Sequence, residues 1–188
     1  YCRRRYHLIV GAKSCYCLYL MHSQYDRMIV LGTTSSDDFP IVGGFDNSFG
    51  GGRGLGNFSA PSGIPFREGS DLVVSVLNET GSALVGSTFV GGSENDGLHL
   101  NETGSPLNYS DQFRGEVIVD EADNIYVAST TQSSNFPTSS NAFQRNYGGG
   151  EEDAVIFQLS PTTSNLIWSS FYGGSGIDAA FSVKVDNV

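Results

Sequence analysis

Cysteine, charge and helical periodicity are all scarce in this chain, and each shortage excludes a class of protein. The three cysteines, Cys2, Cys15 and Cys17, lie at the start of the chain, so disulfides cannot hold the rest of it together. Charged residues make up 16% of the sequence, against about 25% in an average domain. No stretch repeats its apolar residues at helical spacing, which argues against a helical fold.

Side chains that bind metals are present without the spacing that metal sites need. Cys15 and Cys17 form C-x-C, and no downstream cysteine or paired histidine completes a zinc-binding pattern. The three histidines are scattered and form no H-E-x-x-H motif: His7, His22 and His99. We therefore expect no structural or catalytic metal from these residues.

Catalytic motifs are missing as well. There is no G-x-S-x-G nucleophile elbow. Glu151, Glu152 and Asp153 are adjacent, but neighbours on a strand point to opposite faces, so adjacency does not create an acid and base pair. The sequence predicts no enzymatic activity, no catalytic residues and no cofactor.

The chain is acidic, with a formal net charge of -10. Four of its 10 basic residues, Arg3, Arg4, Arg5 and Lys13, precede the first acid, Asp26, so the remainder is more acidic than the total suggests. Such a charge repels phosphate backbones, which argues against a nucleic-acid partner.

Residues 1–24 differ from the rest of the chain. A basic start followed by a short apolar run outlines a secretion signal, but Lys13 interrupts the run and no clean cleavage pattern follows. The run is too short for a membrane span. Three interpretations stay open for this segment: a signal-like sequence, atypical terminal strands, or a fragment boundary.

What the chain has in quantity is glycine, with 24 residues, and aromatic side chains, with 12 Phe and 9 Tyr. The aromatic residues lie in short runs with Val, Ile and Thr, which is typical of strands. Glycine between such runs supplies tight turns. This combination predicts an all-β fold.

The sequence repeats itself in order. TTSSDDFP at 33–40 returns as TTQSSNFP at 130–137, and F-x-x-x-F-G-G-G at 45–52 returns as F-x-x-x-Y-G-G-G at 143–150. DLVVSVL at 71–77 then matches DAVIFQL at 153–159, and STFVGGS at 87–93 matches SSFYGGS at 169–175. Such internal similarity is the signature of repeat architectures.

The repeat divides the chain into residues 25–110 and 111–188. The first unit carries two loop insertions, and the second stops part-way through the pattern. We expect about four antiparallel strands per unit, a blade-like sheet. The expected strands of the second unit are Ile125 to Ser129, Ala154 to Leu159, Leu166 to Phe171 and Phe181 to Val185.

These ordered motifs, with V-x-V-D-x-x-x-N-I-Y-V-A-S-T-T at 117–131 among them, resemble the SBBP β-propeller repeat over roughly residues 26–188. The resemblance implies four-stranded blades in a partial β-propeller or propeller-like array. It also implies a large secreted or cell-surface protein in which the blades act in adhesion or as a scaffold. Because propellers have 4 to 8 blades, about two units would need more chain or neighbouring subunits to close a ring.

Two kinds of site remain as candidates. Four N-x-S/T sequons suit glycan attachment in a secreted protein: Asn57, Asn78, Asn101 and Asn108. Asp120, Asp123 and Asn124 offer oxygens to Ca²⁺, although they lack the order of a calcium loop. Asp and Asn are also expected in a turn between strands, and we favour that structural role.

The sequence therefore predicts an extracellular or cell-surface structural or adhesion module, a glycoprotein built from propeller repeats. Its expected partners are other copies of itself, surface proteins or glycans. Two alternatives stay open. One is a carbohydrate-binding propeller, and the other is an accessory domain of a larger secreted enzyme.

Overall fold

The computed structural model contains strands, turns and loops, in keeping with the predicted all-β class. It describes residues 15–23, 26–55, 66–99 and 115–186. No helix occurs within these ranges, and so none that could cross a membrane.

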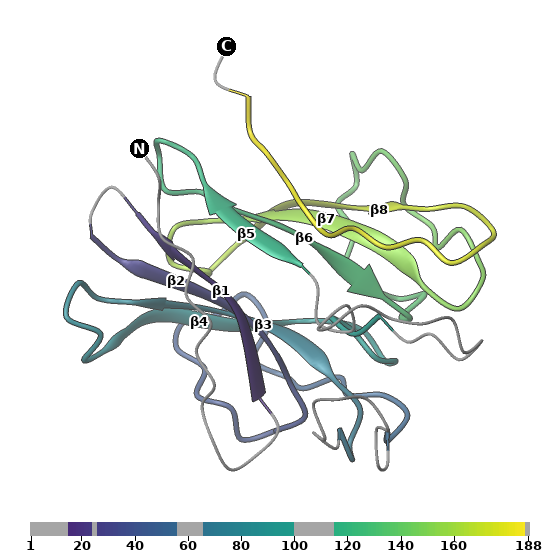
Figure 1. Ribbon diagram of the computed structural model, residues 1–188, viewed down its shortest axis with the longest axis horizontal. Helices are drawn as coiled ribbons and strands as arrows, with labels where there is room; N and C mark the ends of the chain where they lie inside the picture. Colours follow the sequence, from purple (N-terminus) through teal and green to yellow (C-terminus); the bar gives the residue numbers. More distant parts are fainter. Residues whose placement is uncertain (1–14, 24–25, 56–65, 100–114, 187–188) are drawn as a thin grey trace.

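In the described residues, eight strands form two four-stranded antiparallel sheets, each with its strands in sequence order (Figure 1). The first sheet consists of β1 (Cys15–His22), β2 (Met28–Thr34), β3 (Asp71–Leu77) and β4 (Leu84–Val90). The second consists of β5 (Glu116–Val119), β6 (Ile125–Thr131), β7 (Asp153–Leu159) and β8 (Leu166–Tyr172). β-branched and aromatic residues dominate these runs, as the pleated backbone favours.

The two sheets pair their strands in the same register. Thr34 lies opposite Asp71 in the first sheet, and Thr131 lies opposite Asp153 in the second. The third and fourth strands of each sheet also share one irregularity, which falls just before the pair Leu77–Leu84 and just before the pair Leu159–Leu166. Residues 82 positions apart therefore occupy equivalent places in β3 and β7.

The loops around the sheets match as well. Phe39 and Phe49 pack on Phe89, with ring centroids 6.3 and 5.8 Å away. In the second sheet, the same two distances separate Phe171 from Phe136 and Tyr147. Each loop thus folds its two aromatic rings onto the outermost strand of its own sheet.

The core lies between the sheets and uses opposite faces of them. In β3 the core residues are Leu72, Val74 and Val76, whereas in β7 they are Val155, Phe157 and Leu159. Val74 is equivalent to Ile156, not to Phe157, and side chains alternate between the two faces of a strand. We call the face of Val74 and its equivalents the front face and the other the back face. The front face of the first sheet packs on the back face of the second.

The turn between β7 and β8 also docks on the first sheet. The carbonyl of Thr163 accepts a hydrogen bond from the N–H of Phe45 at 2.9 Å. A Cβ at Gly86 would lie 2.1 Å from the carbonyl oxygen of Thr162, so the turn approaches this closely only because residue 86 is glycine. These backbone contacts therefore join the same two sheets that the core joins.

The strand predicted for Phe181 to Val185 is wrong. These residues follow β8 without strand structure and run toward β5, where Ser182 Oγ and Val183 N–H donate to the carboxylate of Glu116 (Figure 1). The fourth strand of this sheet is β5, which precedes β6 in the chain. The side of β6 away from β7 is thus occupied by β5, and residues 181–185 form no ladder with this sheet.

Candidate functional site

At one end of each sheet, a buried aspartate accepts hydrogen bonds from the backbone of the Gly-Gly-Gly segment. Asp71, at the start of β3, accepts the N–H groups of Gly50 and Gly51 at 2.7 and 3.0 Å. Asp153, at the start of β7, accepts the N–H of Gly148 in the equivalent place. These aspartates hold the Gly-Gly-Gly segments against their sheets, which explains why each repeat begins its third strand with Asp.

Asp96 joins the two sheets. It is fully buried, and its carboxylate accepts hydrogen bonds from Gly92 N–H at 2.8 Å, from Ser133 Oγ at 3.0 Å and from Thr131 Oγ1. The glycine belongs to the loop after β4, whereas the two hydroxyl groups belong to Thr131, the last residue of β6, and to Ser133, just after it. Asp178, the equivalent residue of the second unit, accepts Gly174 N–H at 2.8 Å and is half-buried.

Burial changes the protonation of these acids. Loss of solvation raises the pKa of Asp96 well above its ordinary value, despite the hydrogen bonds that oppose the shift. Burial likewise raises the pKa of Asp71 to about 6, with the charge of Asp46 adding a smaller contribution. Burial also raises the pKa of Asp153. All three groups therefore bind protons more tightly in the folded chain than in the unfolded one.

This predicts a fold that is most stable in mild acid. An acid whose folded pKa is raised contributes stability below its unfolded pKa of about 4, and that contribution is lost as the pH rises through the folded pKa. We expect urea denaturation to give a lower free energy of unfolding at pH 7.5 than at pH 5, with Asp71 alone accounting for on the order of 1 kcal/mol.

Asp71→Asn should reduce this pH dependence, because the amide does not titrate. Asp37→Asn is the matched control, since it removes one carboxylate from an exposed position of the loop after β2. A free energy of unfolding that rises between pH 5 and pH 7.5 would contradict the role given to the buried acids.

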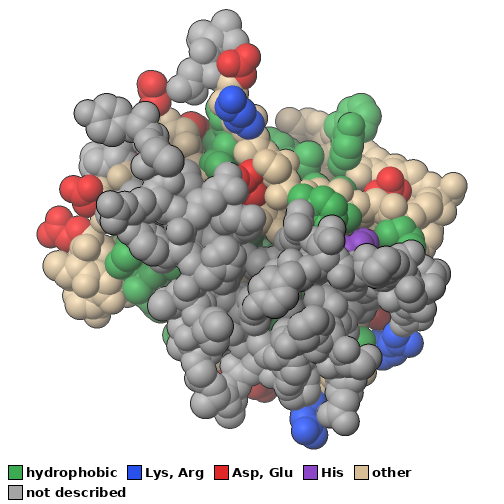
Figure 2. All heavy atoms as spheres, in the orientation of Figure 1, with side chains coloured by type: hydrophobic (Ala, Val, Ile, Leu, Met, Phe, Trp, Pro, Cys, Tyr) green, Lys and Arg blue, Asp and Glu red, His purple; other side chains and the backbone are tan. Residues whose placement is uncertain are grey.

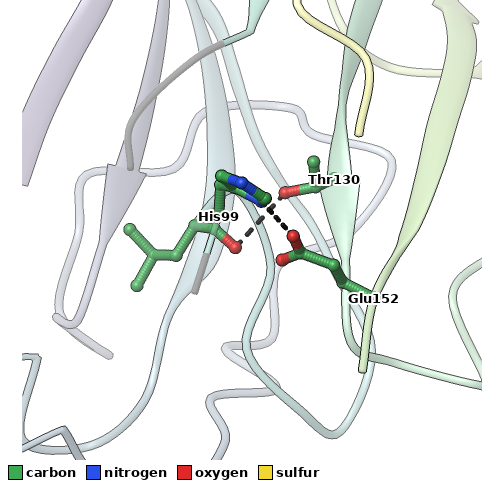
Figure 3. A network of polar contacts seen from close by, with 4 residues as sticks. His99, Thr130 and Glu152 are labelled. Carbon is green, nitrogen blue, oxygen red and sulfur yellow. Dashed lines mark hydrogen bonds and ion pairs between the residues drawn. The ribbon is translucent and has the colours of Figure 1, made fainter. Parts of the chain in front are cut away.

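His99 and Glu152 form a second contact between the units. Nδ1 of His99 meets Oε1 of the fully buried Glu152, and the hydroxyl of Thr130 donates to the carbonyl of Leu98 beside them (Figure 3). The imidazole also meets the ring of Phe181 edge-on at 5.9 Å. The pair fixes the connection after β4 against the start of β7. Sequence reasoning missed it, because 53 residues separate the partners and no motif links them.

An exposed hollow of about 280 Å³ lies at the loop end of the second sheet. Its walls include two large rings, those of Phe143 and Tyr172, whose centroids are 6.2 Å apart. Phe143 is 84% exposed and Tyr172 is 60% exposed. Polar groups at its rim come from Gln144 and Asp178. Apolar side chains this open are the kind that mark interaction sites.

The calcium candidates lie in the turn between β5 and β6. Both oxygens of Asp120 accept hydrogen bonds from within this region, from the N–H groups of Ala122 and Asn124, the Asn124 amide and the Tyr126 hydroxyl. Burial acts to raise the pKa of Asp120, but these hydrogen bonds outweigh it and lower the pKa. Asp123 adopts a left-handed conformation with φ of 61°. Asp120 thus closes the turn.

A metal-binding group built from three or more His, Cys, Asp or Glu side chains does not occur within the described part of the chain.

Of the four sequons, the structure describes one. Asn78 lies in the turn between β3 and β4, where its Oδ1 accepts the N–H groups of Ser82 and Ala83. Its Nδ2 donates to Ser82 Oγ at 3.2 Å on the surface. Asn57, Asn101 and Asn108 lie outside the described residues.

No protein-family model matches this chain, and no curated protein matches it either.

Proposed function

We propose that this chain is a module of an extracellular structural or adhesion protein and that its two sheets are blades of a β-propeller or propeller-like array. The observation that carries the proposal is the packing of the front face of one sheet on the back face of the next. Such a contact joins unlike faces, so a further unit can be added to either end. The resemblance to SBBP repeats supports the same interpretation.

A scaffold role also fits the polar groups inside the fold. Asp71, Asp96 and Asp153 bind backbone amides or hydroxyl groups of neighbouring loops, and the His99–Glu152 pair ties two segments together. Each group thus has a structural task that accounts for its burial. The loops at this end of the sheets then offer variable surface on a fixed frame, as is common for binding modules.

The hollow on the second sheet favours carbohydrate binding as a second candidate. Aromatic rings such as Phe143 and Tyr172 offer apolar faces for a sugar, and Gln144 and Asp178 offer hydrogen-bonding groups beside them. A glycan array probed with the chain and with Tyr172→Ala separates the two candidates. Binding that this substitution abolishes would favour the lectin.

The location of the protein in the cell tests the main proposal directly. An antibody raised against the chain should label intact, unpermeabilised cells that express the natural protein, because a surface scaffold presents its loops outside. An antibody against a cytoplasmic protein of the same cells is the control, and it should label the cells only after they are permeabilised. Labelling of this chain that also requires permeabilisation would contradict an extracellular role.

A further inference from the structure

Several residues on the front face of the second sheet are exposed, although their equivalents on the first sheet are buried. In the first unit, Val90, Asn95 and Asp96 are fully buried and Phe45 packs against the core between the sheets. The equivalent residues of the second unit form an open patch: Phe143 at 84% exposure, Tyr172 at 60%, Ile177 at 43%, and the half-buried Asp178. These four positions, which the first unit covers, are therefore more open one unit later.

On the complementary side, two positions of the first unit are less buried than their equivalents in the second. The hydroxyl of Ser133 donates to Asp96, and the carbonyl of Thr163 accepts the N–H of Phe45. Both residues are fully buried in the contact between the sheets. Their equivalents in the first unit are Ser36, which is half-buried, and Gly81, which is exposed. The backbone around these two serines has the same hydrogen bond in both units, because Ser36 N–H donates to Thr34 Oγ1 as Ser133 N–H donates to Thr131 Oγ1. Within the described residues, the chain thus carries both halves of one contact, and neither half meets its counterpart.

We propose that a second copy of this chain docks on the open patch through its first sheet, repeating the contact that already joins the two sheets. Ser36 of the second copy then donates its hydroxyl to Asp178, as Ser133 donates to Asp96. The turn at its Gly81 faces Phe143, as the turn at Thr163 faces Phe45. This inference rests on the proposed stacking of blades and adds its partner and the residues that meet.

One position sets the fit of the docked copy. Gly86, which admits the turn between β7 and β8, is replaced in the second unit by Trp168. The indole packs edge-on to Tyr126 with ring centroids 6.5 Å apart. The docked turn therefore lies farther from β8 than its counterpart lies from β4, and the contact between copies is looser than the contact within the chain.

Charge opposes this association and makes it depend on salt. The chain carries a net charge of -10, and acidic side chains are spread over the surface in view while basic ones are few (Figure 2). Two copies therefore repel each other at long range, and ions screen this repulsion. Association should strengthen as sodium chloride rises, whereas a contact held by opposite charges would weaken.

The test is sedimentation velocity on the full chain across about 1–100 µM, the range in which a modest interface becomes populated. Wild type should form species larger than the monomer. Two variants each block one half of the contact: Phe143→Ser with Tyr172→Ser on the patch, and Ser36→Glu, which places a carboxylate opposite Asp178. Each alone should lose association by at least about tenfold, since exposed aromatic anchors dominate such contacts. Ala122→Glu adds the same charge at an exposed turn residue and should associate like wild type.

Mixing the two blocked variants gives the decisive result. Each keeps the half that the other lacks, so the mixture should form a one-to-one dimer that neither forms alone. A monomeric wild type, or a mixture that stays monomeric, overturns the proposal. So does a glycan that binds wild type and is lost with Tyr172→Ser while no association occurs. Surface labelling of cells is independent of all three, so failure here is distinct from failure of the proposed function.

Discussion

Replacing Phe157 by alanine is expected to lower the free energy of unfolding by about 3–5 kcal/mol, the range for a fully buried aromatic ring. Phe157 has no exposed surface and belongs to the core that both sheets share. Its ring lies 6.0 Å from that of Phe136. Because single domains are stable by about 5–15 kcal/mol, this loss removes a large part of the total. Urea denaturation followed by circular dichroism measures it.

Phe143→Ala is the matched control. It deletes the same ring from a residue that is 84% exposed, so the loss should stay within about 0.5 kcal/mol, as for surface substitutions. The comparison separates burial between the sheets from aromatic content as such. If the two variants unfolded at the same urea concentration, the shared core could not be the main contact between the sheets.

The strands β3, β4, β7 and β8 were predictable because the repeat shows their sequences twice. The match of residues 71–77 with 153–159 gave the positions of β3 and β7, and the Gly-Gly-Ser segments marked the ends of β4 and β8. The error at Phe181 to Val185 has the opposite cause. A strand forms only beside a partner, and sequence alone does not say which sheet edge is still free.

Face and exposure were harder to predict than strand positions. Ser75 and Phe157 are equivalent back-face residues, yet only Phe157 lies in the core between the sheets. The same holds for Val90 and Tyr172 on the front face, where the first is buried and the second is 60% exposed. Their environments differ because, within the described residues, one of each pair has a neighbouring sheet and the other does not, which is a property of the array and not of the motif.

The buried acids illustrate the same limit. Their place at the head of β3 and β7 could be predicted from the repeated Asp, and a structural role for Asp71 and Asp153 follows from that place. The contact of Asp96 with Thr131 and Ser133 could not, because it joins two units through residues about 35 positions apart. Sequence similarity aligns Asp96 with Asp178 but does not tell which of them has its hydroxyl partners.

Asp96→Ala is expected to lower the free energy of unfolding by about 2–4 kcal/mol, because it removes the acceptor of three donors at once, two of which belong to fully buried residues. Gly92 N–H cannot turn toward another acceptor, whereas the hydroxyl groups of Thr131 and Ser133 can rotate and recover part of the loss. Relief of the cost of burying the carboxylate offsets another part, which keeps the expected loss below that of three full desolvation penalties. Chemical denaturation at pH 7 measures the difference.

Asp178→Ala is the control that the repeat itself provides. Asp178 binds Gly174 N–H at the same distance as Asp96 binds Gly92 N–H, but it is half-buried and lies on the open patch. Its removal should cost less than about 1 kcal/mol of stability, the value of a single exposed hydrogen bond. If a second copy docks there, the same substitution should weaken self-association although it barely affects unfolding. Equal losses of stability at the two positions would show that the hydroxyl groups across the sheets contribute nothing, and the contact proposed between copies would lose its chemical basis.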